Sequence, residues 1–361
     1  MKASFVTYWR HLANGTHTGP FNYLLLGVLI PLSLPYALIQ RLRTWCYQAG
    51  ILRSHTLPRP VISIGNITVG GTGKTPVAAY IAHLLLTQGL KVAVLSRGYG
   101  GTLEGTTAVV SDGSKVLLSA EECGDEPFLL ASTVSGLMVV IGSNRHSAGL
   151  MAMERLSPDI FLLDDGFQHM RLKRDLNILL LDARKPFGNG WCLPAGLLRE
   201  PRSACLRADL VIRTRCPQND SGTTPLPGIP MCNASHELGE AVSLTGGEPL
   251  QLDSLRDKRI LAFAGIADPH AFFDGLRAHG MNLVSTQCLP DHSTYTPADI
   301  AALADTVASS GADYAITTEK DGVKLRHLPV ELAQKVLLAK LTISIDDPTP
   351  LNTALRNLLQ K

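Results

Sequence analysis

The chain has 361 residues, of which 45% are hydrophobic, 18% charged and 6% aromatic, a composition that excludes disordered, collagen-like and coiled-coil proteins. Its net charge of +2 conceals an asymmetry: no Asp or Glu precedes Glu104, whereas nine of the 33 Lys and Arg residues do, and the remainder holds 24 basic and 31 acidic residues. This basic start indicates an anionic membrane surface or phosphorylated ligands. We expect no nucleic-acid partner, because no basic helix with interleaved aromatic residues follows.

The seven cysteines occur singly, with no Cys-x-x-Cys pair in the chain. This spacing argues against a zinc ribbon, a thioredoxin-type site and a secreted disulfide framework. We expect them to be small hydrophobic side chains in a reducing compartment.

The first predicted element is an apolar N-terminal segment. No charged residue lies between Arg10 and Arg41, and Phe21 to Ile39 is close to bilayer-spanning length. A signal peptide and a buried core helix are the alternatives, but no convincing cleavage site follows, and Pro31 and Pro35 weaken a simple helix. We therefore expect a kinked, membrane-embedded helix, with the arginines after it holding the next domain on the cytoplasmic side.

Alternating strands and helices follow. Val61 to Ile64 and Lys91 to Leu95 are predicted strands, and Pro76 to Gln88 between them has apolar residues at helical spacing. Two strands about thirty residues apart with a helix between them form a βαβ unit. Further apolar runs fit a mostly parallel sheet buried on both faces: Leu137 to Ile141, Ile160 to Leu163 and Leu176 to Leu181.

A second α/β block is predicted after a linker-like stretch, Pro217 to Pro230, which is rich in Pro, Gly, Ser and Thr. The block begins with a strand at Arg259 to Phe263. Helical patterns then alternate with apolar runs: Pro269 to Ala278, Leu283 to Cys288, Pro297 to Ala308 and Tyr314 to Thr317.

The strongest chemical signal is the loop between the first strand and its helix, Gly70-Gly71-Thr72-Gly73-Lys74-Thr75. Backbone N–H groups and a helix N-terminus can cradle phosphate there, Lys74 would reach the β- and γ-phosphates, and Thr75 would place its hydroxyl on Mg²⁺. The strict pattern has Gly where this chain has Thr68, although Gly65 and Gly70 still supply the turn. We predict nucleotide binding by Thr68, Gly70, Gly71, Thr72, Gly73, Lys74 and Thr75.

Two acidic sites complete the nucleotide hypothesis. Asp164 ends an apolar strand, as does a Mg²⁺-supporting carboxylate in P-loop enzymes; the alternative is a solvated strand end. Asp125 and Glu126 stand before a predicted helix. Asp125 is a candidate for an N-terminal cap, for a general base, or for both, and Pro127 favours the cap.

A last candidate is His292, in the sequence Pro290-Asp291-His292 at the end of a predicted strand. A lone His is usually a surface or capping residue. His292 becomes catalytic only if the second domain folds over the P-loop.

Together these stretches resemble the tetraacyldisaccharide 4′-kinases, the lipid A 4′-kinases of Gram-negative bacteria. The resemblance runs in order from the hydrophobic N-terminus to about residue 325, and the family's loop carries the same Thr in place of the first Gly. The matching stretches are Gly65 to Pro76, Ser96 to Gly101, Gly124 to Pro127, Asn144-Arg145, Asp164 to His169, Asp182 to Pro201, Pro290 to His292 and Thr317 to Asp321.

The resemblance implies ATP-dependent phosphorylation of the 4′-hydroxyl of an acylated glucosamine disaccharide 1-phosphate, at the cytoplasmic face of the bacterial inner membrane. It implies Asp125 as general base and His292 as its dyad partner, beside Lys74. ATP and Mg²⁺ are the expected cofactors, with Thr75, Glu126 and Asp164 as the metal residues. Substrate contacts are expected from Arg97, Tyr99, Asn144, Arg145, Asp165, Gln168 and His169, and no obligate protein partner is implied.

The predicted fold is α/β: a P-loop NTPase-like parallel-sheet domain, a second, smaller Rossmann-like α/β domain and an N-terminal membrane-embedded helix. The predicted bounds are 1–56 for the N-terminal segment, 57–216 for the kinase domain, 217–258 for a linker region and 259–361 for the C-terminal domain.

The main alternative is a membrane-attached P-loop ATPase switch that controls a partner protein and modifies no lipid. It shares the P-loop and the acidic strand end, but gives no reason for Gly124 to Pro127, Pro290 to His292 and the Leu193 to Pro201 stretch to occur together. A soluble small-molecule kinase is a further alternative, against which the apolar N-terminal segment argues.

Overall fold

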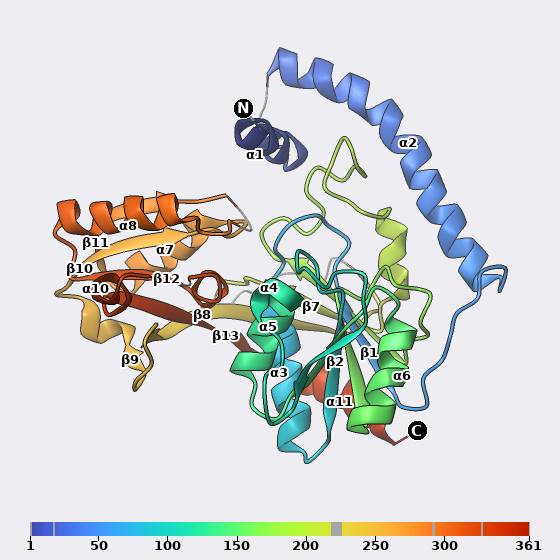
Figure 1. Ribbon diagram of the computed structural model, residues 1–361. Coiled ribbons are helices and arrows are strands. Elements are labelled where there is room, and N and C mark those ends of the chain that lie inside the picture. The colour runs from blue at the N-terminus through green and yellow to red at the C-terminus, as the bar shows by residue number, and fades with distance from the viewer. Residues whose placement is uncertain (1, 17–18, 218–225, 291–292, 326–327, 361) are drawn as a thin grey trace.

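The computed structural model describes residues 2–16, 19–217, 226–290, 293–325 and 328–360. Within these ranges thirteen strands form one sheet, in the order β11-β10-β12-β13-β8-β7-β6-β1-β5-β2-β4-β3, with β9 paired to β8 (Figure 1). The strands are β1 Val61–Gly65, β2 Val92–Ser96, β3 Ala108–Asp112, β4 Met138–Ile141, β5 Ile160–Asp164, β6 Leu176–Asp182, β7 Leu210–Thr214, β8 Met231–Ser243, β9 Leu250–Gln251, β10 Arg259–Ala264, β11 Asn282–Cys288, β12 Tyr314–Thr318 and β13 Val336–Ile345.

The helices cover both faces of this sheet. The α-helices are α1 Lys2–Ala13, α2 Pro20–Gln48, α3 Lys74–Thr87, α4 Ala120–Cys123, α5 Asp125–Thr133, α6 Arg145–Leu156, α7 Pro269–Ala278, α8 Pro297–Ser310, α9 Glu319–Gly322, α10 Val330–Ala333 and α11 Thr349–Leu359, and the short 3₁₀ helices are η1 Arg202–Arg207 and η2 Leu252–Leu255.

The first half of the sheet, β1 to β7, positions the P-loop. All its strands are parallel except the edge strand β3, which pairs antiparallel with β4. Strand β1 lies beside β5 with Ile64 opposite Asp164. Because parallel strands end at the same sheet edge, the loop after β1 and the carboxylate that ends β5 meet there. Apolar side chains of α3, α5 and α11 pack on one face, and those of α6 on the other.

The second half, β10 to β13 with much of β8, is joined to the first by one long strand. Met231 to Asn233 of β8 pair parallel with β7, and Ala234 to Ser243 pair antiparallel with β13. Helix α7 packs on one face of this half, and α8 and α10 on the other. The chain then returns, since Leu351, Leu355 and Leu358 of α11 are buried in the core of the first half.

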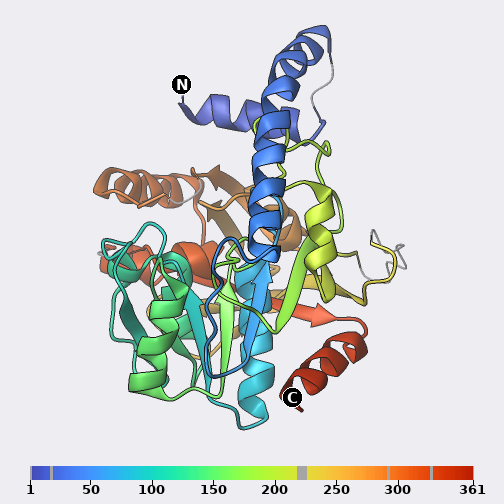
Figure 2. The same cartoon turned by 90° about the vertical axis from the view of Figure 1, so that its right-hand side faces the viewer.

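The N-terminal helix α2 is long and apolar enough, by length and composition, to cross a membrane. It runs through Pro31 and Pro35 without a break, curves in Figure 1 and projects well beyond the sheet in Figure 2. Only Ser33 of this helix is buried: its hydroxyl donates to the Cys192 carbonyl at 2.9 Å and accepts from the Ala195 N–H at 3.0 Å. The helix is docked by this polar contact and by Tyr36 and Ala37, which pack against the apolar cluster that contains Cys192 and Leu198. Most of its other large apolar side chains are exposed.

The expected α/β class, with a mostly parallel sheet and an apolar N-terminal helix, is what the structure contains. Helix α7 has the predicted bounds, and α3 begins at Lys74, two residues earlier than predicted. The domain bounds remain predictions.

Candidate active site

The loop after β1 is shaped for an anion. Gly70 and Gly73 have φ values of 120° and 77°, where side chains are disfavoured. A Cβ on Gly73 would also lie 2.7 Å from Nε2 of His236, so only glycine fits. Helix α3 begins at Lys74, and no side chain caps its first N–H groups. Free N–H groups at a helix N-terminus bind phosphate oxygens, which is the role predicted for this loop.

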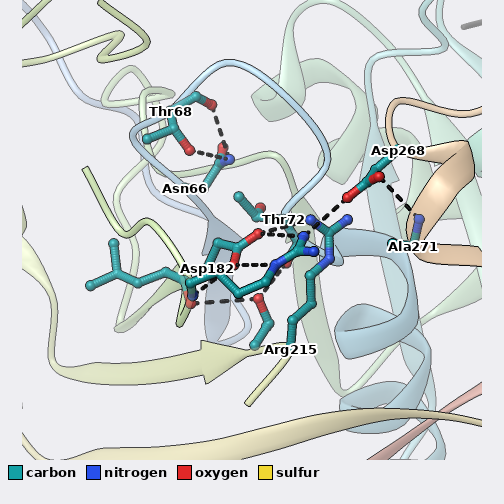
Figure 3. A network of polar contacts seen from close by, with 10 residues as sticks. Asn66, Thr68, Thr72, Asp182, Arg215, Asp268 and Ala271 are labelled. Carbon is teal, nitrogen blue, oxygen red and sulfur yellow. Dashed lines mark hydrogen bonds and ion pairs between the residues drawn. The ribbon is translucent and has the colours of Figure 1, made fainter. Parts of the chain in front are cut away.

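The loop is held in place by polar contacts with residues at the ends of neighbouring strands. The buried Thr214 hydroxyl, at the end of β7, donates to the Thr72 carbonyl at 2.9 Å. Asn66 donates through Nδ2 to the Thr68 carbonyl at 3.0 Å and contacts the Thr68 hydroxyl at 3.3 Å (Figure 3). Thr68 is therefore a buried support of the loop, whereas the residues from Gly70 to Thr75 line the cleft above it.

Asp164 is a buried carboxylate at the end of β5. Burial first, and then the charges of Glu126 and Asp165, raise its pKa to about 7, although Lys74 and Arg145 oppose the shift. Its Oδ1 has no hydrogen-bond partner among the described residues. A buried anionic oxygen without a partner is costly, and a divalent cation would supply the missing partner. The residues here thus fit Mg²⁺.

The metal would take few ligands from this chain. Among the described residues, no three His, Cys, Asp or Glu side chains stand close enough to hold a metal by themselves. Mg²⁺ is usually bound through one or two carboxylates with phosphate and water oxygens. Asp164, Glu126 and Thr75 all line the same cleft, as that mode requires.

Asp165 is the second carboxylate at this edge and adopts a left-handed conformation with φ 50°. Nη1 of Arg199 donates to both Asp165 oxygens, at 3.1 Å to Oδ1 and 2.9 Å to Oδ2. Nζ of Lys74 lies 3.7 Å from Oδ1 of the same carboxylate. Burial opposes ionisation of this carboxyl, but the charges of Lys74 and Arg199 hold its pKa below the usual value. Lys74 is therefore paired with an acid at the mouth of the P-loop.

Asp125 and Glu126 begin α5 and face the second half of the molecule. The N-cap of α5 is Gly124 and Asp125 is the first residue of the helix, with no side-chain cap hydrogen bond at that end. Of the alternatives for Asp125, the structure therefore does not support the N-terminal cap. Glu126 Oε1 lies 3.4 Å from Nζ of Lys320, and Asp125 Oδ2 lies 3.8 Å from Nζ of Lys324. The start of α5 thus carries two carboxylates that meet lysines from the other half.

Arg145, Gln168 and His169 line the same cleft. Burial lowers the pKa of Arg145 to about 10 while Asp164 and Asp165 oppose the shift, and its Nη1 donates to the Gly142 carbonyl. Burial and nearby arginines lower the pKa of His169 to about 4, so its ring is neutral at pH 7. Gln168 donates through Nε2 to the Asn66 carbonyl at 2.8 Å.

The remaining predicted contacts are more peripheral. Arg97 and Tyr99 are exposed on the cleft wall, and Arg97 pairs with Glu104 at 3.1 Å. Asn144 does not line the cleft: its side-chain oxygen caps α6 by accepting from the N–H groups of His146 and Ser147. His292 lies outside the described residues.

The cleft between the two halves has a volume of about 2510 Å³. Every described residue predicted for the site lines it, except Thr68 and Asn144. Several charged residues of the cleft walls were not predicted from the sequence: Arg184, Arg199, Arg215 and Lys320. Arg199 and Lys320 stand inside stretches that carry the family resemblance, but no signal in the sequence assigned them a role.

A polar network also links the halves across the cleft. Arg184 contacts Asp182, at the end of β6, at 3.3 Å and Asp268, at the start of α7, at 3.1 Å. Arg215 contacts Asp182 at 2.8 Å (Figure 3). Asp268 in turn accepts from the Ala271 N–H as the N-cap of α7. The first turn of α7 is thereby tied to the sheet edge that carries the P-loop.

Known proteins match both the sequence and this fold. A family model described as "LpxK: Tetraacyldisaccharide-1-P 4'-kinase" matches residues 25–360. The curated tetraacyldisaccharide 4′-kinase of Pelobacter propionicus is 62% identical over 361 residues, covering all of both chains, and that of Geobacter metallireducens is 54% identical over 336 residues, covering 93% of this chain and 99% of its own. A crystal structure of LpxK from Aquifex aeolicus in complex with ATP has a TM-score of 0.78 and 34% identity, covering 92% of this chain and 99% of that one.

The raised pKa of Asp164 predicts that this carboxyl destabilises the metal-free fold at neutral pH. The unfolded chain ionises it near 3.8 and the folded chain near 7, so stability falls as the pH rises between these values and the loss persists above them. We expect Asp164→Asn to raise the melting temperature at pH 8 in EDTA, with a difference that disappears below about pH 4. Thermal unfolding followed by circular dichroism checks this, and a variant less stable than the parent at pH 8 would contradict it.

Proposed function

Because the chain belongs to the tetraacyldisaccharide 4′-kinase family, we propose that the cleft between its two halves is where ATP and the lipid substrate meet. The protein is an ATP-dependent kinase of lipid A biosynthesis that phosphorylates the 4′-hydroxyl of tetraacyldisaccharide 1-phosphate. The observation that carries the placement is the convergence of the P-loop, Asp164 and the start of α5 on one cleft.

We assign the triphosphate to the P-loop. The N–H groups at the start of α3 would hold its oxygens, and Lys74 would exchange Asp165 for the β- and γ-phosphates. Thr75, Glu126 and Asp164 would hold Mg²⁺, with the partnerless Asp164 oxygen as its strongest attraction. Bound there, Mg²⁺ neutralises charge on the phosphates during transfer.

We assign the proton transfer to Asp125. As the 4′-oxygen forms its bond to the γ-phosphorus and the bond to ADP breaks, the hydroxyl proton passes to the Asp125 carboxylate. His292 is proposed as the partner of Asp125, a role that rests on the family resemblance of Pro290 to His292. Phosphoryl transfer depends mostly on such positioning and on charge neutralisation, both of which this cleft offers.

We assign the sugar and its phosphate to the side of the cleft that faces α2. Arg43 of α2 donates to the Gln168 carbonyl at 3.1 Å, and the Tyr36 hydroxyl donates to the Arg199 carbonyl at 3.0 Å. The apolar helix thus reaches the walls of the site directly. The residues proposed to contact the disaccharide are Arg97, Tyr99, Arg145, Asp165, Gln168 and His169, all of which line the cleft; Asn144 is left out because its side chain caps α6.

We place the protein at the cytoplasmic face of the bacterial inner membrane, anchored by α2. Its apolar side chains are exposed along the helix: Phe21, Leu24, Val28, Leu32, Leu34, Leu38, Ile39, Leu42 and Trp45. Exposed apolar area of this extent on one helix is typical of a membrane contact. The basic residues around it suit anionic lipid headgroups.

The kinase assignment predicts transfer of label from γ-labelled ATP to an extracted acylated disaccharide 1-phosphate. We expect Lys74→Ala to lower this transfer by about 10²-fold or more, because a cation aimed at the transferring phosphate stabilises the transition state in a water-poor site. Lys115→Ala, an exposed lysine outside the cleft, is the matched control and should transfer normally. Release of phosphate without labelled lipid would instead indicate an ATPase switch.

The anchor assignment predicts that Leu24→Glu with Val28→Glu moves the protein from the membrane pellet to the soluble fraction. Both side chains are exposed, so folding should be unaffected, and Val330→Glu, an equally exposed site on α10, is the control.

The exposed Cys288 thiol tests the side of the membrane on which the protein lies. An impermeant maleimide should label it in inverted vesicles and not in intact spheroplasts; the reverse pattern would overturn the cytoplasmic placement.

A further inference from the structure

Two lysines of one short segment reach across the cleft to the two carboxylates that begin α5. Lys320 in α9 meets Glu126 at 3.4 Å, and Lys324, one helical turn later, meets Asp125 at 3.8 Å. Helix α5 lies on the side of the first half that faces the second (Figure 1). The two contacts differ in burial, since the Lys320 side chain is 22% exposed and that of Lys324 only 7%.

Lys324 is anchored within its own half by a buried acid. Its Nζ lies 3.2 Å from Oδ1 of Asp321, which is fully buried. The other Asp321 oxygen accepts from the Gly265 N–H at 3.0 Å and from the Thr318 hydroxyl at 2.8 Å. A buried carboxylate with these two hydrogen bonds cannot move independently of the sheet. Its other oxygen and the Lys324 ammonium are joined as an ion pair, although no hydrogen bond links them among the described residues.

An aromatic ring supports the same ammonium. The Lys324 Nζ lies 5.6 Å from the centre of the Tyr295 ring. Tyr295 is buried and has a left-handed backbone with φ 49°, a strained conformation that persists only where the surroundings impose it. A cation over an aromatic face is attracted to it, more strongly when both are removed from water. Lys324 is therefore held by Asp321 and Tyr295 and points its charge at Asp125.

Described residues on either side of positions 291–292 also lie near this anchor. A Cβ on Gly265 would lie 3.0 Å from Oδ1 of Asp321 and 3.2 Å from the Pro290 carbonyl oxygen, so backbone and acid pack closely only around a glycine. Pro290 precedes His292 by two residues, and Tyr295 follows it by three. Asp321 thus pairs with Lys324 and accepts from Gly265, the residue whose Cβ position lies against the Pro290 carbonyl.

We propose that Lys324 is a positioning residue for phosphoryl transfer, which holds the Asp125 carboxylate in place from the opposite half of the molecule. The proposal rests on the assignment of Asp125 as the base. A base must lie within hydrogen-bond reach of the hydroxyl, and misplacement by about 1 Å costs about 10²-fold in rate. At 3.8 Å the ammonium orients the carboxylate and leaves its oxygens able to accept the substrate proton.

The charge balance of the step agrees with this role. The proton leaves the 4′-oxygen for Asp125 as the oxygen–phosphorus bond forms and the bond to ADP breaks. Lys324 keeps its own proton throughout and stays paired with Asp321, so neutralisation of Asp125 leaves no isolated cation behind. Lys320 differs, because its partner Glu126 is assigned to the metal and not to the proton.

The test compares kcat and KM for Lys324→Met, Asp125→Asn and the double variant at saturating Mg²⁺, with Lys320→Met as the matched change one turn away. We expect Lys324→Met to lower kcat by about 10²-fold while both KM values change by less than about threefold. The double variant should be no worse than Asp125→Asn within about threefold, because residues of one mechanism are not additive. Because its partner Glu126 is assigned to the metal, Lys320→Met should shift the Mg²⁺ dependence, and at saturating Mg²⁺ its loss of kcat should be at least about tenfold smaller than that of Lys324→Met. Lys335→Met, an exposed lysine of the same half outside the cleft, should leave kcat unchanged.

Three results would overturn the proposal: a normal kcat for Lys324→Met, multiplicative losses in the double variant, or an equal loss in Lys320→Met, which would indicate a general loosening of the halves. A normal kcat for Asp125→Asn would instead reject the assignment of the base itself. Lys324→Met leaves the buried Asp321 carboxylate unpaired, and the variant could fail to fold for that reason. In that case the double variant Lys324→Met with Asp321→Asn, which removes both buried charges, is measured instead. Its reference is the single variant Asp321→Asn.

Discussion

The site depends on one constraint, the burial of the Asp164 carboxylate at the end of a central strand. A charged oxygen without a hydrogen-bond partner is costly inside a protein, and here the cost falls where β5 ends beside the P-loop. The charges of Lys74 and Arg145 lie nearby and oppose the rise in the pKa of this carboxyl, and a divalent cation bound there would supply the missing partner. In the proposed arrangement the same carboxylate would bring metal and phosphate together, and we expect it to lower the stability of the metal-free protein at neutral pH.

The second half of the molecule completes the cleft through a few long-range contacts. Strand β8 belongs to both halves, and Arg184 ties the end of β6 to the start of α7. Lys320 and Lys324 then meet the carboxylates of α5. Because these contacts join rigid sheet edges and helix ends, a small shift of one half against the other would move charged groups relative to the P-loop.

Local patterns in the sequence were sufficient for the P-loop, the strands around it and Asp164, since neighbouring parallel strands bring their carboxyl ends together. They were insufficient where pairing is distant: β8 and β13 are antiparallel partners about a hundred residues apart, and α11 returns to the first core. The residues that cap the helices were also not predicted correctly from local sequence. The cap that was one alternative for Asp125 is not formed, whereas Asn144, expected at the substrate, caps α6. The lysine partners of α5 depend on the packing of the two halves, which no local pattern encodes.

The most direct test of this account is the effect of Mg²⁺ on ATP binding, measured by titration calorimetry with the full chain and with Asp164→Asn. If the buried carboxylate is the metal's main protein partner, Mg²⁺ should tighten ATP binding to the parent by at least about tenfold and leave the variant nearly unchanged. Equal tightening in both proteins would contradict the account, because the metal would then be held without the carboxylate on which the site is argued to depend.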